Sequence, residues 1–170
     1  MKLANRQQQV QLLRIARKLH RVTGITLLAF FLFVSVTGLL LGWKKHSGGH
    51  ILPESQRGGT TEIQAWLPVA TLHQKARQYL RDSVSASLST EIDRMDIRPD
   101  KGMVKILFEG HHHELQLDGA TGELLQASYR YSDLFERIHD GSILDTWAGT
   151  GNGFFKLLYT TTLALALLLF

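Results

Sequence analysis

The stretch VTGITLLAFFLFVSVTGLLLGW, residues 22–43, contains 22 residues and no charged side chain. As an α-helix it would extend over about 33 Å, which is enough to cross a hydrocarbon core of about 30 Å. A helix of this length at the surface of a soluble protein would carry a polar face. The stretch therefore predicts a transmembrane helix.

The charges that flank this helix predict its orientation. Residues 1–21 contain six Lys and Arg and no acidic residue, whereas residues 44–153 contain 12 Lys and Arg against 15 Asp and Glu. The positive-inside rule then places residues 1–21 in the cytoplasm as a basic arm, and the centre of the chain across the membrane. A cleaved signal peptide is the alternative, but its apolar region should be only about 7–15 residues long.

A second apolar segment, FFKLLYTTTLALALLLF, occupies residues 154–170. Its 17 residues are short for a membrane span, and Lys156 and Tyr159 are typical anchors at a membrane surface. Because the sequence stops inside the apolar run, we expect an incomplete second transmembrane helix.

Composition excludes several classes of function. The chain has no cysteine, which excludes thiolate chemistry and iron–sulfur clusters in this chain. The net charge of +4 reflects the basic arm and not a nucleic-acid-binding face, so no nucleic-acid partner is expected. The sequence contains no Gly-rich phosphate loop, H-E-x-x-H or G-x-S-x-G motif.

Between the two apolar segments, the pattern predicts a small α+β domain. Residues 44–65 form a Gly- and Ser-rich connector without periodicity, and residues 67–82 have helical spacing with Pro68 in the first turn. Residues 92–98, 103–108 and 109–128 then predict about four antiparallel strands joined by Gly-containing turns. We expect one domain over residues 66–130.

Residues 131–150 predict an amphipathic segment at the outer membrane interface. Asp133 and Glu136 fit a D-x-x-E capping box at its start, and Leu134, Phe135 and Ile138 form an apolar stripe.

Four short motifs follow one another along the chain: LHR-x-x-G at residues 19–24, TGLLL at 37–41, LDGATGELL at 117–125 and IHDGSIL at 138–144. In this order they resemble the PepSY-associated transmembrane family, from about Leu13 onward. The resemblance implies a bacterial inner-membrane protein with its PepSY domain in the periplasm. Larger relatives resemble iron-regulated membrane proteins and siderophore reductases, some of which hold haem through histidines at the membrane edge. This chain departs from them in having one PepSY unit, at most two membrane helices and no histidine in the second.

The resemblance implies three candidate haem ligands, which are His20 at the inner edge and His46 and His139 at the outer edge. The alternative for His20 is a polar residue among arginines at the headgroup level, and for His139 an essential structural hydrogen bond. In the run at residues 111–113, His111 and His113 would share one face of a strand and are candidate metal ligands, although a solvent-facing strand end is the favoured interpretation.

Helix length limits how these histidines can combine. His20 and His46 are separated by about 39 Å of helix, so they cannot bind one iron, and a bis-histidine haem at the inner side requires a second chain. Ser35, Gly38 and Gly42 form a face of small residues that would suit either a parallel homodimer or packing against the second helix of the same chain. At the outer side, His46 and His139 could meet within one chain.

Two functional hypotheses follow from these observations. In the first, the protein is a component of envelope electron transfer and of iron or siderophore reduction, with haem b on His20 and His139, and with His46 as a further ligand. In the second, it is a non-enzymatic, membrane-tethered periplasmic interaction module or an accessory subunit. Both place the chain in the lipid bilayer, together with another membrane or periplasmic protein or a second copy.

Overall fold

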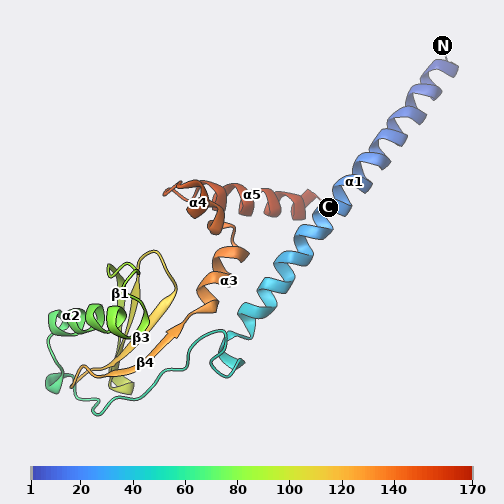
Figure 1. Cartoon of the computed structure of the whole chain (residues 1–170). Coiled ribbons are helices and arrows are strands. Elements are labelled where there is room, and N and C mark those ends of the chain that lie inside the picture. Colours follow the sequence, from blue (N-terminus) through green and yellow to red (C-terminus); the bar gives the residue numbers. More distant parts are fainter. Residues whose placement is uncertain (1, 170) are drawn as a thin grey trace. The chain divides into compact units, whose positions relative to one another are not determined.

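The computed structural model describes the backbone of residues 2–169 and the side chains of residues 8–168. The chain forms two compact units (Figure 1). The helical unit combines the residues up to Leu39 with those from Arg137 onward, and the sheet domain comprises Leu40–Glu136.

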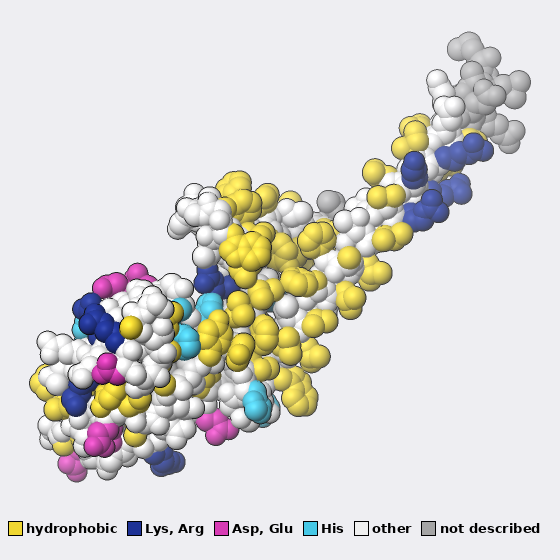
Figure 2. All heavy atoms as spheres, viewed as in Figure 1, with side chains coloured by type: hydrophobic (Ala, Val, Ile, Leu, Met, Phe, Trp, Pro, Cys, Tyr) yellow, Lys and Arg dark blue, Asp and Glu magenta, His cyan; other side chains and the backbone are white. Residues whose placement is uncertain are grey.

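Helix α1, Lys2–Gly42, is continuous and confirms the long apolar helix predicted from the sequence. Its segment Gln8–Gly42 has the length and apolarity needed to cross a membrane. Apolar side chains cover much of its visible surface, and Lys and Arg gather toward its N-terminal end (Figure 2). The hydroxyls of Thr23 and Thr26 donate to the carbonyls of Leu19 and Val22, so these polar groups are satisfied within the helix.

Three further helices follow the sheet: α3, Tyr131–His139, α4, Ser142–Ala148, and α5, Phe154–Leu169. The segment predicted as one amphipathic stretch is thus divided, at Asp140 and Gly141. Gly141 has φ +77°, a backbone conformation that favours glycine, and the ring of Tyr159 lies 3.0 Å from where a Cβ would be. Both the backbone conformation and the lack of space therefore require glycine at this turn. The predicted capping box is wrong, because α3 begins two residues before Asp133 and the Asp133 carboxylate binds the Arg130 side chain instead.

The sheet domain confirms the predicted helix followed by four antiparallel strands. Helix α2, Val69–Tyr79, continues into a π-turn, Leu80–Val84, and the strands pair in the order β1-β2-β3-β4. The strands are β1, Ile92–Arg98, β2, Met103–Phe108, β3, His113–Asp118, and β4, Leu124–Tyr129. Short 3-10 turns lie at Lys44–His46, Ile63–Ala65 and Pro99–Lys101.

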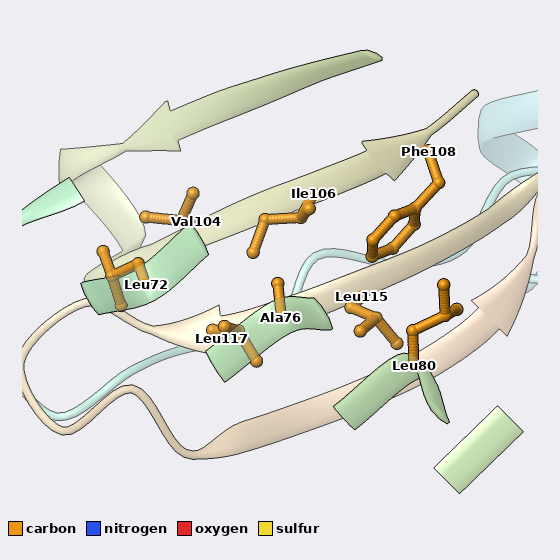
Figure 3. Packing of buried hydrophobic residues seen from close by; sticks show 8 residues of the cluster. All are labelled: Leu72, Ala76, Leu80, Val104, Ile106, Phe108, Leu115 and Leu117. Carbon is orange, nitrogen blue, oxygen red and sulfur yellow. The ribbon is translucent and has the colours of Figure 1, made fainter. Parts of the chain in front are cut away.

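One face of the sheet packs against α2 and the turn that follows it (Figure 3). The contacting side chains are apolar and come from alternate positions of β2 and β3, as the two-residue period of a strand requires. They are Leu72, Ala76 and Leu80 from the helix and Val104, Ile106, Phe108, Leu115 and Leu117 from the strands.

The other face of the sheet carries Met103 and Leu107 together with polar side chains, and its centre is also buried. Lys105, Glu114, Gln116 and Asp118 are each at most 6% exposed. The residues before α2 cover this face, because the Gln116 amide accepts from the backbone N–H of Gln56 at 2.8 Å and donates to the carbonyl of Glu54 at 2.9 Å. The connector predicted at residues 44–65 therefore forms one layer of the domain.

Glu114, which is fully buried, lies at the centre of this polar face. Its carboxylate accepts from Lys105 Nζ at 3.1 Å, from Gln116 Nε2 at 2.7 Å and from Arg130 Nη1 at 2.5 Å. Burial lowers the pKa of Arg130, but hydrogen bonds and charge from Asp133 and Glu114 raise it more, so its pKa lies above the usual value. The cluster joins β2, β3 and the start of α3 through charged hydrogen bonds.

Asp118 fixes the connector at the far end of β3. Its carboxylate accepts from the backbone N–H groups of Gly59 at 2.5 Å, Ala120 at 2.7 Å and Thr121 at 2.9 Å. Gly58 lies so close to the Gly102 carbonyl that no side chain fits there. This end of the connector is thus held by one carboxylate and requires glycine.

We predict that Glu114→Gln lowers the free energy of unfolding of the sheet domain by about 3–5 kcal/mol, because two cations would lose their buried partner. The matched control is Glu123→Gln in the exposed β3–β4 turn, which should change it by less than about 0.5 kcal/mol. The measurement is urea denaturation in detergent, followed by the fluorescence of Trp66 with Trp43 and Trp147 replaced by Phe. Equal midpoints for the two variants would contradict a stabilising role for the Glu114 cluster.

A second prediction concerns pH. Burial raises the pKa of Asp118, but the hydrogen bonds from Thr121, Gly59 and Ala120 lower it more, so its pKa lies below the usual value. The resulting stabilisation is complete above the pKa of the unfolded chain and is lost as the pH falls from about 4 toward the lower folded-state value. Asp118→Asn should therefore have a lower free energy of unfolding than the wild type at pH 7. Between about pH 5 and about pH 3, the range in which carboxyl groups titrate, it should lose less of that free energy than the wild type does. The same urea denaturation measures both. A loss on acidification as large as in the wild type would count against this assignment.

Candidate functional site

His139, one of the predicted haem ligands, makes a defined contact within the helical unit. It is the last residue of α3, and its Nδ1 lies 2.8 Å from Oγ1 of Thr37 on α1. A Cβ at Gly38 would lie 3.4 Å from His139 Cε1, so the imidazole packs directly on the α1 backbone. The contact brings together the TGLLL and IHDGSIL motifs, since Thr37 and His139 are 102 positions apart in the sequence.

The hydroxyl of Thr37 favours one tautomer of the His139 ring. Thr37 is 6% exposed, and its Oγ1 lies 3.0 Å from the Phe33 carbonyl and 3.1 Å from the Val34 carbonyl. We assign the single hydroxyl hydrogen to these carbonyls, so that the oxygen accepts from His139 Nδ1–H. In the neutral ring Nε2 then keeps its lone pair, which is the form of imidazole that binds a metal.

Acidic side chains of the same unit hold the start of α5. The Asp145 carboxylate accepts from the backbone N–H groups of Phe155 at 3.0 Å and Lys156 at 2.9 Å, and from the Thr150 hydroxyl at 2.8 Å. Burial raises the pKa of Asp145, but these hydrogen bonds lower it more, so the group stays ionised at the positive end of the helix. Asp140 forms an ion pair with Lys156 at 2.6 Å.

The other predicted haem ligands do not join His139 within the helical unit. His20 precedes Thr37 by 17 positions on the continuous helix α1, a separation of about 26 Å. His20 and His139 of one chain therefore cannot bind the same iron. His46 belongs to the sheet domain, in the 3-10 turn Lys44–His46, and its meeting with His139 stays a prediction.

His111 and His113 lie side by side, with ring centroids 5.4 Å apart, although His111 is in the turn before β3 and not in the strand. His111 accepts from the His113 backbone N–H at Nδ1, which leaves Nε2–H to donate to the Ser89 carbonyl at 3.0 Å. Metal binding by His111 would therefore break one of these bonds. Among the side chains that the structure describes, no three His, Asp or Glu residues gather into a candidate metal site.

The small-residue face of α1 is partly used within the chain. Gly38 is covered by His139, whereas Ser35 is exposed. Within the described part of the chain, no atom comes within 4 Å of a Cβ placed on Gly42. Sequence reasoning identified Gly38 but missed Thr37, its neighbour in the TGLLL motif and the partner of His139.

Together, a long apolar helix, a second apolar helix fastened at its start and a separate α+β fold define a membrane protein that carries a small folded domain. The family model described as the PepSY-associated TM region matches residues 2–170. The chain belongs to this family, as its motifs predict, and it is a membrane protein with a PepSY domain. No curated protein and no solved structure matches the chain significantly.

Proposed function

We propose that this protein is a membrane-tethered, non-enzymatic module that presents its PepSY domain to another protein of the bacterial envelope. The observation that carries the proposal is the hydrogen bond between Thr37 and His139. It gives the histidine a structural role, since it fastens the end of α3 to α1. Asp140 and Asp145 bind the start of α5, so the helices of this unit are held together by polar contacts of side chains with one another and with the backbone.

The proposed location is the cytoplasmic membrane, with the PepSY domain on the periplasmic side. The support is the charge of the N-terminal arm, whose six Lys and Arg have no acidic neighbour among residues 1–21. Helix α5 contributes a second membrane segment in this proposal. Its 16 residues extend about 24 Å, somewhat less than a full span.

Haem binding is the second candidate function, and one observation favours it. The bond from Nδ1–H to Thr37 leaves Nε2 of His139 as the nitrogen with a lone pair and fixes the ring, as partners of metal-bound histidines do. The fit is incomplete, because the helical unit of one chain offers a single imidazole at this depth. A second axial ligand would have to come from His46, from another copy or from another protein. When bound, haem would supply one-electron transfer.

Substitutions at His139 separate the two candidates. Asn places a polar atom near the position of Nδ1 and has none at the position of Nε2. His139→Asn should therefore keep the hydrogen bond to Thr37 and remove the nitrogen that would bind the haem iron. For the structural role, we expect amide exchange of α3 to stay near wild type in His139→Asn and to rise roughly tenfold in His139→Leu and Thr37→Val, as the loss of about one hydrogen bond implies. Hydrogen–deuterium exchange of the full chain in detergent measures this.

The same preparations give the visible absorption spectrum, as isolated and after dithionite, with haem supplied during expression. The tether proposal expects no Soret band. A Soret band with reduced α and β bands that His139→Asn abolishes would overturn it in favour of the haem candidate. Unchanged exchange in both His139→Leu and Thr37→Val would remove the structural role on which the proposal rests.

The orientation has its own test, which the absence of native cysteine makes clean. Gln9→Cys and Arg57→Cys place single thiols at exposed positions of the arm and of the connector. In spheroplasts, a membrane-impermeant maleimide should label position 57 directly and position 9 only after lysis. The reverse pattern would place the PepSY domain in the cytoplasm.

A further inference from the structure

A groove of about 800 Å³ lies on the polar face of the sheet domain, and its lining is strongly basic. Residues 52–55 of the connector form one side of the groove, and β1 contributes Arg94, Asp96 and Arg98. The lining includes six Lys or Arg side chains and two carboxylates, those of Glu54 and Asp96. The volume falls in the range of about 300–1,000 Å³ that is typical of ligand-binding clefts.

The cations of the groove are not all neutralised within the domain. Lys105 and Arg130 are paired with Glu114, and Arg94 lies 4.0 Å from Asp96. Within the side chains that the structure describes, Lys45, Arg98 and Lys101 have no ion-pair partner. An anionic ligand would therefore meet positive charge that the domain has left uncompensated.

These cations are spaced along the direction of β1. Arg94 and Arg98 lie four residues apart on the same face of the strand, a distance of about 13 Å, and Lys101 follows in the turn after the strand. An extended peptide places side chains on one face about every 7 Å. Acidic residues four positions apart in such a peptide would therefore lie opposite Arg94 and Arg98, with the residue midway between them opposite Asp96.

The polar face of the sheet already binds one extended segment, which is the connector. The connector lies on it through the two bonds between its backbone and the Gln116 amide, and Gln56 Nε2 donates to Gln126 Oε1 at 3.1 Å. The connector covers β3 and leaves the β1 side open as the groove. A second extended segment lying beside the connector is the occupant that this geometry fits.

We propose that this groove binds an extended, acidic segment of a partner protein. The inference rests on the proposed tethering function, since it identifies the surface of the PepSY domain through which the partner is held. Arg94, Arg98 and Lys101 bind its carboxylates, and Lys105 and Arg130, which are paired with Glu114, form the floor of the groove. A single small anion would fill only a small part of the groove.

The test uses the full chain in nanodiscs of phosphatidylcholine and a fluorescein-labelled peptide with three Glu-Ala-Ser-Ala repeats. Binding is measured by fluorescence anisotropy at low salt. Arg94→Gln/Arg98→Gln removes two groove cations, and the matched control Lys75→Gln/Arg81→Gln removes two cations from α2 and the turn after it, on the opposite face. We expect the groove variant to bind at least about tenfold more weakly and the control to bind like the wild type.

Every other outcome overturns the inference. Absence of binding, or equal loss in the two double variants, would mean that the groove is not the site. Displacement of the peptide by inorganic phosphate or citrate at equal charge concentration would mean a site for small anions only. These failures leave the tethering proposal intact, since that proposal is judged by the His139 variants and by labelling, neither of which depends on Arg94 or Arg98.

Discussion

The buried carboxylate of Glu114 is the constraint on which the sheet domain depends. An ionised group without solvent is costly unless charged partners and hydrogen bonds surround it, and here Lys105, Arg130 and Gln116 provide them. Each partner comes from a different place in the fold: Lys105 from β2, Gln116 from β3 and Arg130 from the residue between β4 and α3. The carboxylate can therefore be satisfied only when these parts are assembled together, which links the burial of one side chain to the folding of the domain.

The same constraint explains why the connector is ordered. Glu114 and Gln116 lie on the face of the sheet opposite α2, so something must exclude water from that face. The connector does so with its backbone, which exchanges two hydrogen bonds with the Gln116 side chain and one with Asp118. Because it covers β3 and not β1, the polar face is divided into a dry part around Glu114 and an open part lined by cations. The basic groove is a consequence of that division.

Local patterns in the sequence were sufficient to predict the elements but not this layer. The absence of charge over residues 22–43 predicts α1, and Gly119 and Gly122 mark the turn between β3 and β4. The role of the connector depends on Gln116 and Glu54, which are 62 positions apart and interact through a side-chain amide and a carbonyl. Such a contact produces no periodic pattern in the sequence, because any residue can supply a backbone carbonyl. The Asp133 capping box failed for a related reason, because Arg130, bound to Glu114, competes for the Asp133 carboxylate.

In the helical unit, one set of contacts accounts for five residues of two motifs. Thr37 and Gly38 receive the His139 ring, Asp140 pairs with Lys156, and Gly141 allows the chain to turn against Tyr159. A histidine held in this way needs no cofactor to explain its position. Haem would need the same fixed ring and, in addition, a second ligand that α1, α4 and α5 do not provide at this depth among their described residues. The structural role is therefore the simpler explanation, and Nε2, the ring nitrogen that does not face Thr37, is the atom on which the two functions differ.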